Sequence, residues 1–542
     1  MTTKTEANGT DTLYNTCTKL LAMNNNGTLL WVDDEIDLLK PLIIFLENKG
    51  YSVDRATNGP DALDMLHARN YDLVLLDENM PGLSGLDTLN KIKVISPTIP
   101  VVMVTKSEEE DIMNQAIGSQ IADYLIKPVN PNQILLTLKK NIHKQEIRHD
   151  VTQTSYLQEF HQLSSRISSA STLSDWQALY RRIVYWELEL SEIGDELSQT
   201  LLMQKQDANQ AFARFIRHNY ENWFRTPRPA GAPLMSHHII PRCVFPLLSR
   251  GERVFLLIID NFRYDQWRTI LPSLSDLYNW EEDLYVSLLP TVTEFARNAI
   301  CAGLLPLDIK RLYPDYWVAD TDDDEGKNLF EAQLLAKLME RSRRTERYSY
   351  HKLNDSLAID KLLGSFHTLL YNQFNVLVIN FIDILSHAKT EHQMIHELVG
   401  NEQAFRSITL SWFRNTSMRR LLESIARSGY TLLLTTDHGS KQVETPVKII
   451  GDRQTNTNLR FKVGKNLNFG REKELFSIRK PSAVGLPEPN ISSSYVFCSS
   501  SQFFAYPNNY NYYVQYYKGS FQHGGISLEE MLIPIITLTP KP

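Results

Sequence analysis

Short apolar runs alternate with amphipathic stretches between Thr28 and about Lys140, and this alternation constrains the fold more than any other feature. The stretches between the runs have helical spacing and end at glycine, as in IDLLKPLIIFLENKG. Strands and helices that alternate in this way predict a parallel sheet with helices on both faces. The predicted strands are LLWVDD (29–34), YSVDRA (51–56), DLVLLD (72–77), VVMVT (101–105) and DYLI (123–126).

Polar side chains with a shared chemistry stand at the ends of these strands. Asp33 and Asp34 close the first strand, Asp77 closes the third, and Thr105 and Lys127 come at the ends of the fourth and fifth. Clustered carboxylates bind Mg²⁺, because this hard cation prefers oxygen ligands. A carboxylate beside Mg²⁺ can attack a phosphoryl donor, while a lysine and a hydroxyl hold the phosphoryl oxygens.

The segments VDDE, LLDENMPGLSG, VTKS and YLIKP resemble the receiver domain of two-component response regulators, which has a flavodoxin-like fold. The resemblance implies that Asp77 is the phosphoacceptor and that Mg²⁺ is held by Asp34, Asp77 and the backbone carbonyl of Asn79, with help from Asp33. It further implies that Thr105 and Lys127 contact the phosphoryl group and that Tyr124 is the aromatic switch residue. A sensor histidine kinase is the implied partner.

The composition limits what the rest of the chain can be. The 542 residues are enough for several domains, and acidic residues outnumber basic ones, 63 to 56, which disfavours general polyanion binding. The four cysteines lack CxxC spacing, and no apolar run is long enough to cross a bilayer. We expect a cytoplasmic protein without membrane insertion, with a disordered leader (1–26), the receiver (27–145), a helical connector (146–225) and a large output domain (226–542).

A heptad-like seam runs through the connector, whose sequence is rich in Gln, Leu, Glu and Arg. Packing within one chain is the favoured interpretation, because ordinary globular helices are amphipathic, and a dimeric coiled coil is the alternative. The seam consists of Trp176, Leu179, Ile183, Trp186, Leu190, Ile193 and Leu197.

Strand-like runs return in the output domain, and three of them finish on an aspartate. Ligands of parallel α/β sheets bind beyond the carboxyl ends of the strands, so the three carboxylates are expected to converge on one site. The runs are RVFLLIID (253–260), NVLVINFID (375–383), YTLLLTTD (430–437) and MLIPIITL (531–538).

Histidine and aspartate together form the ligand set of catalytic zinc sites. Asp383 and His387 are one helical turn apart and can close on one ion. The full set of candidate ligands is Asp260, Asp383, His387, Asp437, His438 and His523, which is enough for two metal ions.

PTVTEFARNAICAGLLP (290–306) supplies the candidate nucleophile. Thr291 and Glu294 have the spacing of a capping box, so Thr293 falls in the first turn of a helix, where backbone N–H groups favour a developing anion. Arg297, four residues later, could hold a phosphoryl oxygen. Thr291 is the rival nucleophile, although a capping role already accounts for it.

These segments are similar to the alkaline phosphatase superfamily and resemble its PglZ branch. Thr293 precedes Gly303 by the spacing of the phosphodiesterase branch, although Phe295 and Ala296 replace the proline and asparagine of that pattern. The resemblance implies an α/β/α output domain with two zinc ions. Asp383, His387 and His523 would hold one ion, while Asp260, Asp437 and His438 would hold the other, which also activates Thr293.

The whole chain resembles PorX-like response regulators, which join a receiver to a PglZ domain. This resemblance implies a zinc-dependent phosphodiesterase that acts on oligonucleotide signals and is linked to type IX secretion. We further expect a phosphorylation-dependent homodimer and a sigma factor or secretion component as partner. The alternative is a non-catalytic adaptor in which zinc only stiffens the domain. A direct DNA-binding regulator is disfavoured, because no basic recognition helix stands out.

One further segment, VKIIGDRQTNTNLRFKVGKNL (447–467), carries basic residues interleaved with aromatic ones. Such a segment could grip a phosphodiester while its aromatic rings stack on bases. A solvated hairpin is an equally acceptable interpretation, since runs of charge usually face water.

Overall fold

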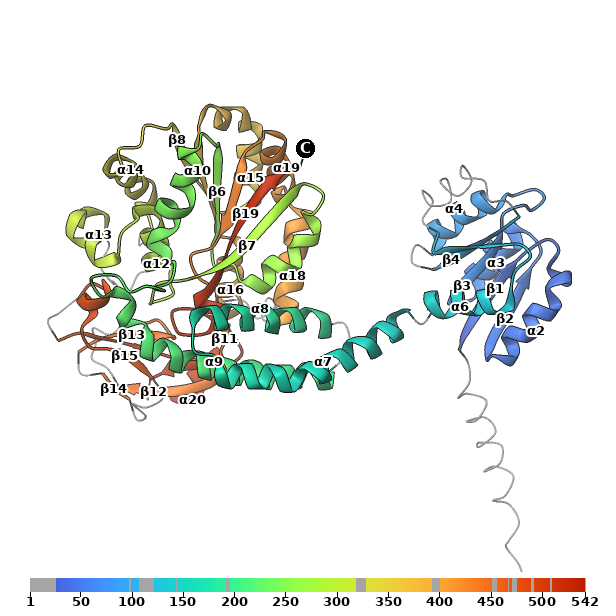
Figure 1. Cartoon of the computed structure of the whole chain (residues 1–542), viewed down its shortest axis with the longest axis horizontal. Coiled ribbons are helices and arrows are strands. Elements are labelled where there is room, and N and C mark those ends of the chain that lie inside the picture. Colours follow the sequence, from blue (N-terminus) through green and yellow to red (C-terminus); the bar gives the residue numbers. More distant parts are fainter. Residues whose placement is uncertain are drawn as a thin grey trace, which may run out of the picture. The chain divides into compact units, whose positions relative to one another are not determined.

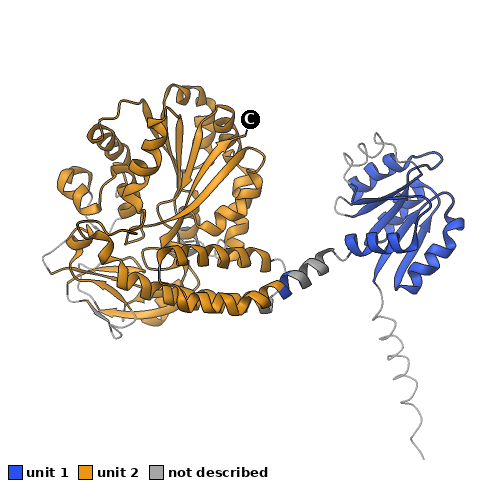
Figure 2. Cartoon of the chain, viewed as in Figure 1, with its two compact units in different colours: residues 1–154 blue, residues 155–542 orange. Residues whose placement is uncertain are grey.

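The computed structural model divides the chain into two compact units, residues 1–154 and 155–542 (Figure 2). The expected disordered leader, apart from Asn26, lies outside the described residues. The residues described are 26–96, 99–106, 121–142, 144–191, 195–317, 328–391, 400–450, 456–465, 467–469, 475–488, 492–506 and 509–541.

A five-stranded parallel sheet with the order β2-β1-β3-β4-β5 forms the first unit (Figure 1). Alternate residues of β1 face opposite sides: Leu29 and Trp31 pack into one core, and Leu30 and Val32 into the other. The flavodoxin-like sheet expected from the sequence is therefore confirmed. Its strands are β1 (Gly27–Val32), β2 (Tyr51–Ala56), β3 (Leu73–Asp77), β4 (Val101–Thr105) and β5 (Asp123–Ile126).

Helices cover both faces of this sheet, and local hydrogen bonds mark where two of them begin. The Asn58 side chain accepts a hydrogen bond from the N–H of Asp61, and the Ser84 hydroxyl accepts one from the N–H of Asp87. Among the described residues, the helices are the 3-10 turn η1 (Ile36–Leu39), α2 (Lys40–Asn48), α3 (Gly59–Ala68), α4 (Gly85–Ile95) and α6 (Pro131–Ile142).

Three helices follow the receiver: α7 (Lys144–Ser169), α8 (Leu173–Leu190) and α9 (Asp195–Asn219). A capping box between Thr172 and Asp175 starts α8. The seam residues from Trp176 to Leu190 are buried in one hydrophobic cluster together with residues of the C-terminal sheet, so packing within the chain is confirmed. The seam is not continuous, because α8 ends at Leu190, Ile193 lies outside the described residues and Leu197 belongs to α9.

A six-stranded mixed sheet with the order β7-β19-β10-β6-β9-β8 is the centre of the second unit (Figure 1). Strands β8, β9, β6 and β10 are parallel, and β19 runs antiparallel to both β7 and β10. The strands are β6 (Val254–Ile259), β7 (Tyr278–Val286), β8 (Tyr348–Leu353), β9 (Phe374–Ile379), β10 (Thr431–Thr435) and β19 (Leu532–Pro540).

The two faces of this sheet are packed by different helices. Leu256 and Ile258 of β6 face a cluster formed with α10, α12 and α14, while Phe255 and Leu257 face a cluster formed with α11, α15, α18 and α19. This is the α/β architecture expected for the output domain. The helices are α10 (Phe245–Ser249), α11 (Tyr264–Ile270), α12 (Thr293–Ala302), α13 (Pro306–Leu312), α14 (Glu331–Arg341), α15 (Ser356–Gly364), α16 (Phe381–Glu391), α18 (Glu402–Asn415) and α19 (Met418–Arg427).

In the described part of the insertion between β10 and β19, smaller sheets are accompanied by two α-helices. One sheet pairs β11 (Lys441–Gln442) with β18 (Phe521–Gln522), and a second joins β12 (Thr445–Ile450) to β14 (Asn468–Phe469) and β17 (Gln502–Ala505). A third joins β16 (Ser494–Phe497) to β13 (Phe461–Gly464) and β15 (Phe476–Ile478). The helices are α20 (Tyr510–Tyr517) and α21 (Leu528–Met531). No helix in the described part of the chain has both the length and the apolar content that a bilayer span requires.

Candidate metal and phosphoryl-transfer sites

The candidate phosphoacceptor Asp77 ends β3 and is buried beside Lys127. The Lys127 ammonium lies 2.9 Å from Asp77 and 2.7 Å from Asp33, so it bridges the two carboxylates. Burial raises the pKa of Asp77, Lys127 opposes that rise, and Asp33 and Asp34 add to it. A divalent cation here would counter the mutual repulsion of the carboxylates.

The other candidate receiver residues surround this pair. Asp34 is exposed, and its carboxylate lies within 4.8 Å of those of Asp33 and Asp77, a spacing that suits one cation. Thr105 is buried at the end of β4, and Asn79 is exposed two residues beyond β3. Tyr124 lies on β5 with 39% of its surface exposed. The positions match those expected, and the roles remain predictions.

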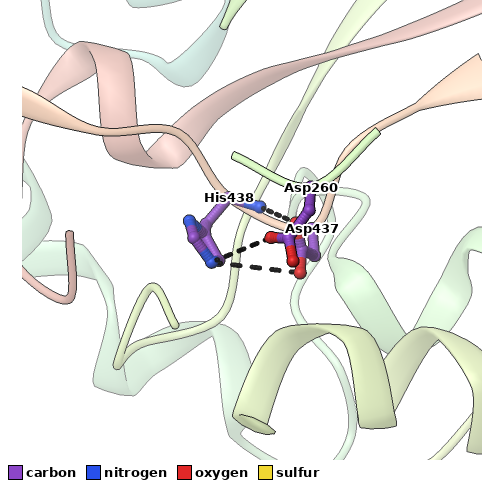
Figure 3. A group of neighbouring side chains, drawn as sticks. All are labelled: Asp260, Asp437 and His438. Atoms are coloured by element: carbon purple, nitrogen blue, oxygen red, sulfur yellow. Dashed lines mark hydrogen bonds and ion pairs between the residues drawn. The ribbon is translucent and has the colours of Figure 1, made fainter. Parts of the chain in front are cut away.

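A second cluster forms where β6 and β10 end side by side in the second unit. Asp260 follows β6 directly, and Asp437 and His438 follow β10. Ligand atoms of all three side chains lie within 4.8 Å of one another, and all three residues are buried. Figure 3 shows both carboxylates facing the imidazole, whose Nε2 lies 3.7 Å from Asp260 and 3.9 Å from Asp437.

The cluster has the properties of a cation site. Oδ2 of Asp437 is buried and accepts no hydrogen bond from any described residue, and a bound cation would satisfy such an oxygen. Burial raises the pKa of Asp260 well above its ordinary value; Arg297 opposes this shift, and Asp437 and Asp383 add to it. One nitrogen and two carboxylate ligands match the donor set of catalytic zinc.

Thr293 is the first residue of α12, and its hydroxyl points at the cluster. Oγ1 lies 3.0 Å from Nε2 of His438 and 3.4 Å from Oδ1 of Asp260. The capping role predicted for Thr291 is wrong, because Val292 is the N-cap residue and no side chain caps α12. The Thr291 hydroxyl instead donates to the carbonyl of Gly525 and accepts from the N–H of Gly524. The Thr291 hydroxyl is therefore engaged in hydrogen bonds, but with the backbone of Gly524 and Gly525 and not as a helix cap.

Arg297 has partners different from the phosphoryl oxygen that we expected it to hold. Its guanidinium is 1% exposed and lies between Asp260, at 2.5 Å, and Glu331, to which Nε donates. Asn380 accepts a further hydrogen bond of 3.3 Å. Arg297 thus donates to Asp260, Glu331 and Asn380.

Two of the three ligands predicted for the second zinc ion, Asp383 and His523, lie close together. His523 directly follows β18, lies 3.7 Å from Asp383, and stacks on His438 with the ring centroids 4.4 Å apart. Asp383 does not end a strand as predicted, because β9 ends at Ile379 and Asp383 lies in the first turn of α16. His387 is one turn further along α16, and its side chain lies outside the described residues.

Asn261 joins the two ligand groups and was missed by the sequence analysis. Its side-chain amide donates to Asp383, at 3.1 Å, and its backbone N–H donates to Asp437, at 3.4 Å. The backbone φ of Asn261 is +59°, a conformation that asparagine tolerates better than most residues. An asparagine directly after a strand-end aspartate was the available signal.

Two basic residues of the 447–467 segment are buried, while Lys448 is exposed and residues 451–455 and 466 lie outside the described residues. Arg460 is fully buried and pairs with Glu530 at 2.5 Å. Lys462 is 1% exposed and donates to the carbonyl of Asn456. The described part of this segment therefore offers neither of these cations to a ligand.

Three family models match the chain in succession. The response regulator receiver domain matches residues 29–139, the PorX response regulator linker domain matches 146–224, and the BREX system PglZ alkaline phosphatase-like domain matches 239–538. Together with the parallel receiver sheet, these matches define a two-component response regulator with an alkaline phosphatase-like output domain. The PglZ model covers more than half of the residues, so the chain belongs to the PglZ family, as a PorX-like member.

Individual curated relatives match about a quarter of the chain. The transcriptional regulatory protein ResD of Bacillus subtilis is 34% identical over 132 residues, which are 24% of this chain and 52% of ResD. The transcriptional regulatory protein ZraR of Klebsiella oxytoca is 37% identical over 127 residues, 23% of this chain and 29% of ZraR. The chain thus spans about half of the first relative and less than a third of the second. Among solved structures, the Vibrio cholerae chemotaxis protein CheY4 is 26% identical over 21% of this chain and 97% of its own, with a TM-score of 0.21.

Proposed function

We propose that the output domain is a zinc-dependent phosphodiesterase with Thr293 as its nucleophile and that oligonucleotides are its substrates. The observation that carries the proposal is the position of the Thr293 hydroxyl, 3.0 Å from His438 and 3.4 Å from Asp260, at the start of a helix. Asp260, Asp437 and His438 would hold one zinc ion, and Asp383, His387 and His523 would hold the second. Bound zinc supplies Lewis acidity and lowers the pKa of the hydroxyl that it contacts.

The residues of the chain carry out the nucleophilic attack and position the metal ligands. Thr293 Oγ1 loses its proton and forms a bond to the phosphorus of the diester, while the bond from phosphorus to the leaving oxygen breaks and that oxygen takes up a proton. Water then cleaves the bond between Oγ1 and phosphorus, which releases a phosphomonoester and restores the Thr293 hydroxyl. The positive end of the α12 helix dipole lies at Thr293 and favours the anion that develops there. Arg297 holds Asp260 through the 2.5 Å ion pair, and Asn261 fixes Asp383 relative to Asp437.

The receiver is proposed to control this output. A sensor histidine kinase supplies the phosphoryl group to Asp77, with Mg²⁺ held by Asp34, Asp77 and the Asn79 carbonyl. Phosphorylation alters pairing through the Tyr124 face and favours a homodimer in the cytoplasm. A sigma factor or secretion component is the proposed downstream partner, which would link the protein to type IX secretion.

Zinc analysis combined with a hydrolysis assay tests the enzyme proposal. We expect the wild type to contain zinc and to cleave a chromogenic phosphodiester and short oligonucleotides, and Thr293→Ala to lose this activity while it keeps the metal. Thr445→Ala, which removes an exposed threonine of β12, is the matched control and should be fully active. Zinc binding without hydrolysis in the wild type would instead support the non-catalytic adaptor.

Light scattering with and without a small-molecule phosphoryl donor tests the receiver proposal. The wild type should shift from monomer to dimer, and Asp77→Ala should not, because it lacks the acceptor carboxylate. Asp64→Ala, which removes an exposed carboxylate of α3, should behave as the wild type. An identical shift in Asp77→Ala would contradict phosphorylation at this residue.

A further inference from the structure

Helix α9 of the linker and Tyr220, the residue after it, contact the segment before Thr293 and the segment after His523. Tyr220, directly after α9, accepts a hydrogen bond of 2.8 Å from the N–H of Leu289, four residues before Thr293. Asn209 accepts one of 2.8 Å from the N–H of Leu528, at the start of α21. The ammonium of Lys205 lies 2.9 Å from Glu529, the next residue of α21. The linker therefore packs against two segments that flank candidate site residues.

Contacts that begin at Lys205 lead, through Glu529 and Lys441, to the segments that carry both histidines. Glu529 also binds Lys441, at 2.6 Å, and Lys441 belongs to β11, three residues after His438. Strand β11 pairs with β18, Lys441 opposite Gln522, and Gln522 immediately precedes His523. This short ladder joins the segments that carry the two stacked histidines, so a displacement of Lys441 would act on both segments.

The backbone supports the same connection. A Cβ at Gly439, the residue after His438, would lie 2.1 Å from the carbonyl oxygen of Glu529, so the histidine loop packs directly on the backbone of that residue. Only glycine allows this approach. The position of Glu529 thus sets the position of the His438 loop.

Lys205 belongs to a buried network whose formal charges balance. Each of its eight side chains is at most 14% exposed. Burial raises the pKa of Glu529, but Lys205 and Lys441 more than offset that effect and hold the pKa at about 2. The four cations are Lys205, Arg263, Arg406 and Lys441, and the four anions are Glu187, Asp265, Glu402 and Glu529.

From these contacts we infer that Lys205 is a positioning residue of the metal site: by holding Glu529 and, through it, Lys441, it fixes the separation of His438 and His523. The inference rests on the proposed function, in which these two histidines each ligate zinc. Residues that orient metal ligands without touching the metal typically change metal affinity about 10- to 100-fold when they are removed.

Two variants separate positioning from simple charge balance. Lys205→Met leaves one uncompensated negative charge in the network and breaks the link to Glu529. The double variant Lys205→Met/Glu187→Gln also breaks the link, but it restores the balance of charge, because Glu187 faces Lys205 at 2.6 Å. If Lys205 only neutralises carboxylates, the double variant will regain both stability and zinc affinity.

The experiment measures zinc dissociation constants by competition with a chromophoric chelator, together with the unfolding temperature, for the full chain. We expect the double variant to unfold near the wild-type temperature and to bind zinc about 10- to 100-fold more weakly. Lys337→Met, which removes an exposed lysine of α14, is the control and should bind zinc as the wild type does. Zinc affinity of the double variant equal to that of wild type overturns this inference alone. A wild type that binds no zinc overturns both the inference and the proposed function.

Discussion

Lys462 shows at the scale of one residue how burial changes a side chain's chemistry. Its ammonium is 1% exposed, donates to the carbonyl of Asn456 at 2.7 Å, and lies 4.6 Å from the ring centroid of Tyr506. Burial lowers the pKa of Lys462 from 10.5 to about 7. In the unfolded chain the lysine keeps its proton up to about pH 10.5, so the protonated form opposes folding below pH 7. This unfavourable contribution disappears as the pH rises from 7 to 10.5.

We therefore predict that Lys462→Met is more stable than the wild type, and most so at or below pH 7. The pKa difference corresponds to at most about 5 kcal/mol of unfolding free energy, less about 1 kcal/mol for the lost hydrogen bond. Urea unfolding at pH 6 and pH 9.5 measures the difference, which should shrink at the higher pH. Lys361→Met, at an exposed position of α15, should show no such dependence, and a pH-independent gain for Lys462→Met would refute the explanation.

Glu331, unlike Lys462, favours folding, because it compensates the buried charge of Arg297. It accepts hydrogen bonds from Arg297 and from the Tyr350 hydroxyl, and it lies 3.3 Å from Lys352. Removing it leaves the Arg297 guanidinium with fewer carboxylates in a site that excludes water. Such a loss typically costs about 3–5 kcal/mol.

Glu331→Ala should accordingly lower the unfolding free energy by about 3–5 kcal/mol in guanidinium titrations. Glu340→Ala on the same helix removes a carboxylate that is 71% exposed, and it should change stability by less than about 0.5 kcal/mol. Similar losses for the two variants would mean that burial of the Arg297 ion pairs does not matter.

Among the secondary-structure elements, the receiver strands were predictable, while the absence of a side-chain cap at the start of α12 was not. Each receiver strand is a short apolar run bounded by polar residues, and the predicted and observed bounds differ by at most two residues. Thr291 has the spacing of a cap, but the backbone of Gly524 and Gly525, more than 230 residues away, takes its hydroxyl. A local pattern cannot reveal a competitor that the fold brings in from elsewhere.

Some residues of the candidate site were likewise predictable from the sequence, and others were not. Asp260, Asp437, His438 and Thr293 meet as their positions at strand and helix ends predicted, because parallel strands bring their carboxyl ends to one edge. Glu331, Asn261 and Lys205 were missed, since each acts through a partner distant in the sequence. Arg460 has a sequence context typical of a ligand-binding cation, yet its partner Glu530 makes it structural.

At the scale of the whole molecule, the linker helices share one hydrophobic core with the output domain. Trp176 of α8 is 1% exposed and packs edge-on against Phe212 of α9 in that core. The receiver cores contain other residues, from β1 to α6. We expect the linker and the output domain to unfold together and the receiver to unfold separately.

Trp176→Ala tests this division. It should destabilise the second unit by about 3–5 kcal/mol, because it opens a large cavity, and should leave the receiver transition in place. Differential scanning calorimetry of the full chain resolves the two transitions. Leu202→Ala, at a side chain of α9 that is 48% exposed, is the control. A single transition that moves as a whole in Trp176→Ala would show that the two units are not independent.

The place of β19 in the central sheet has a consequence for biosynthesis. β19 lies between β7 and β10, and it pairs Leu532 with Val286, 246 residues earlier. A ribosome adds about 5–20 residues per second, so β7 and β10 leave the exit tunnel well before the strand that separates them. Until β19 arrives, their edges are exposed to other chains. The receiver sheet, in contrast, is complete once β5 has emerged, and its folding need not wait for the rest of translation.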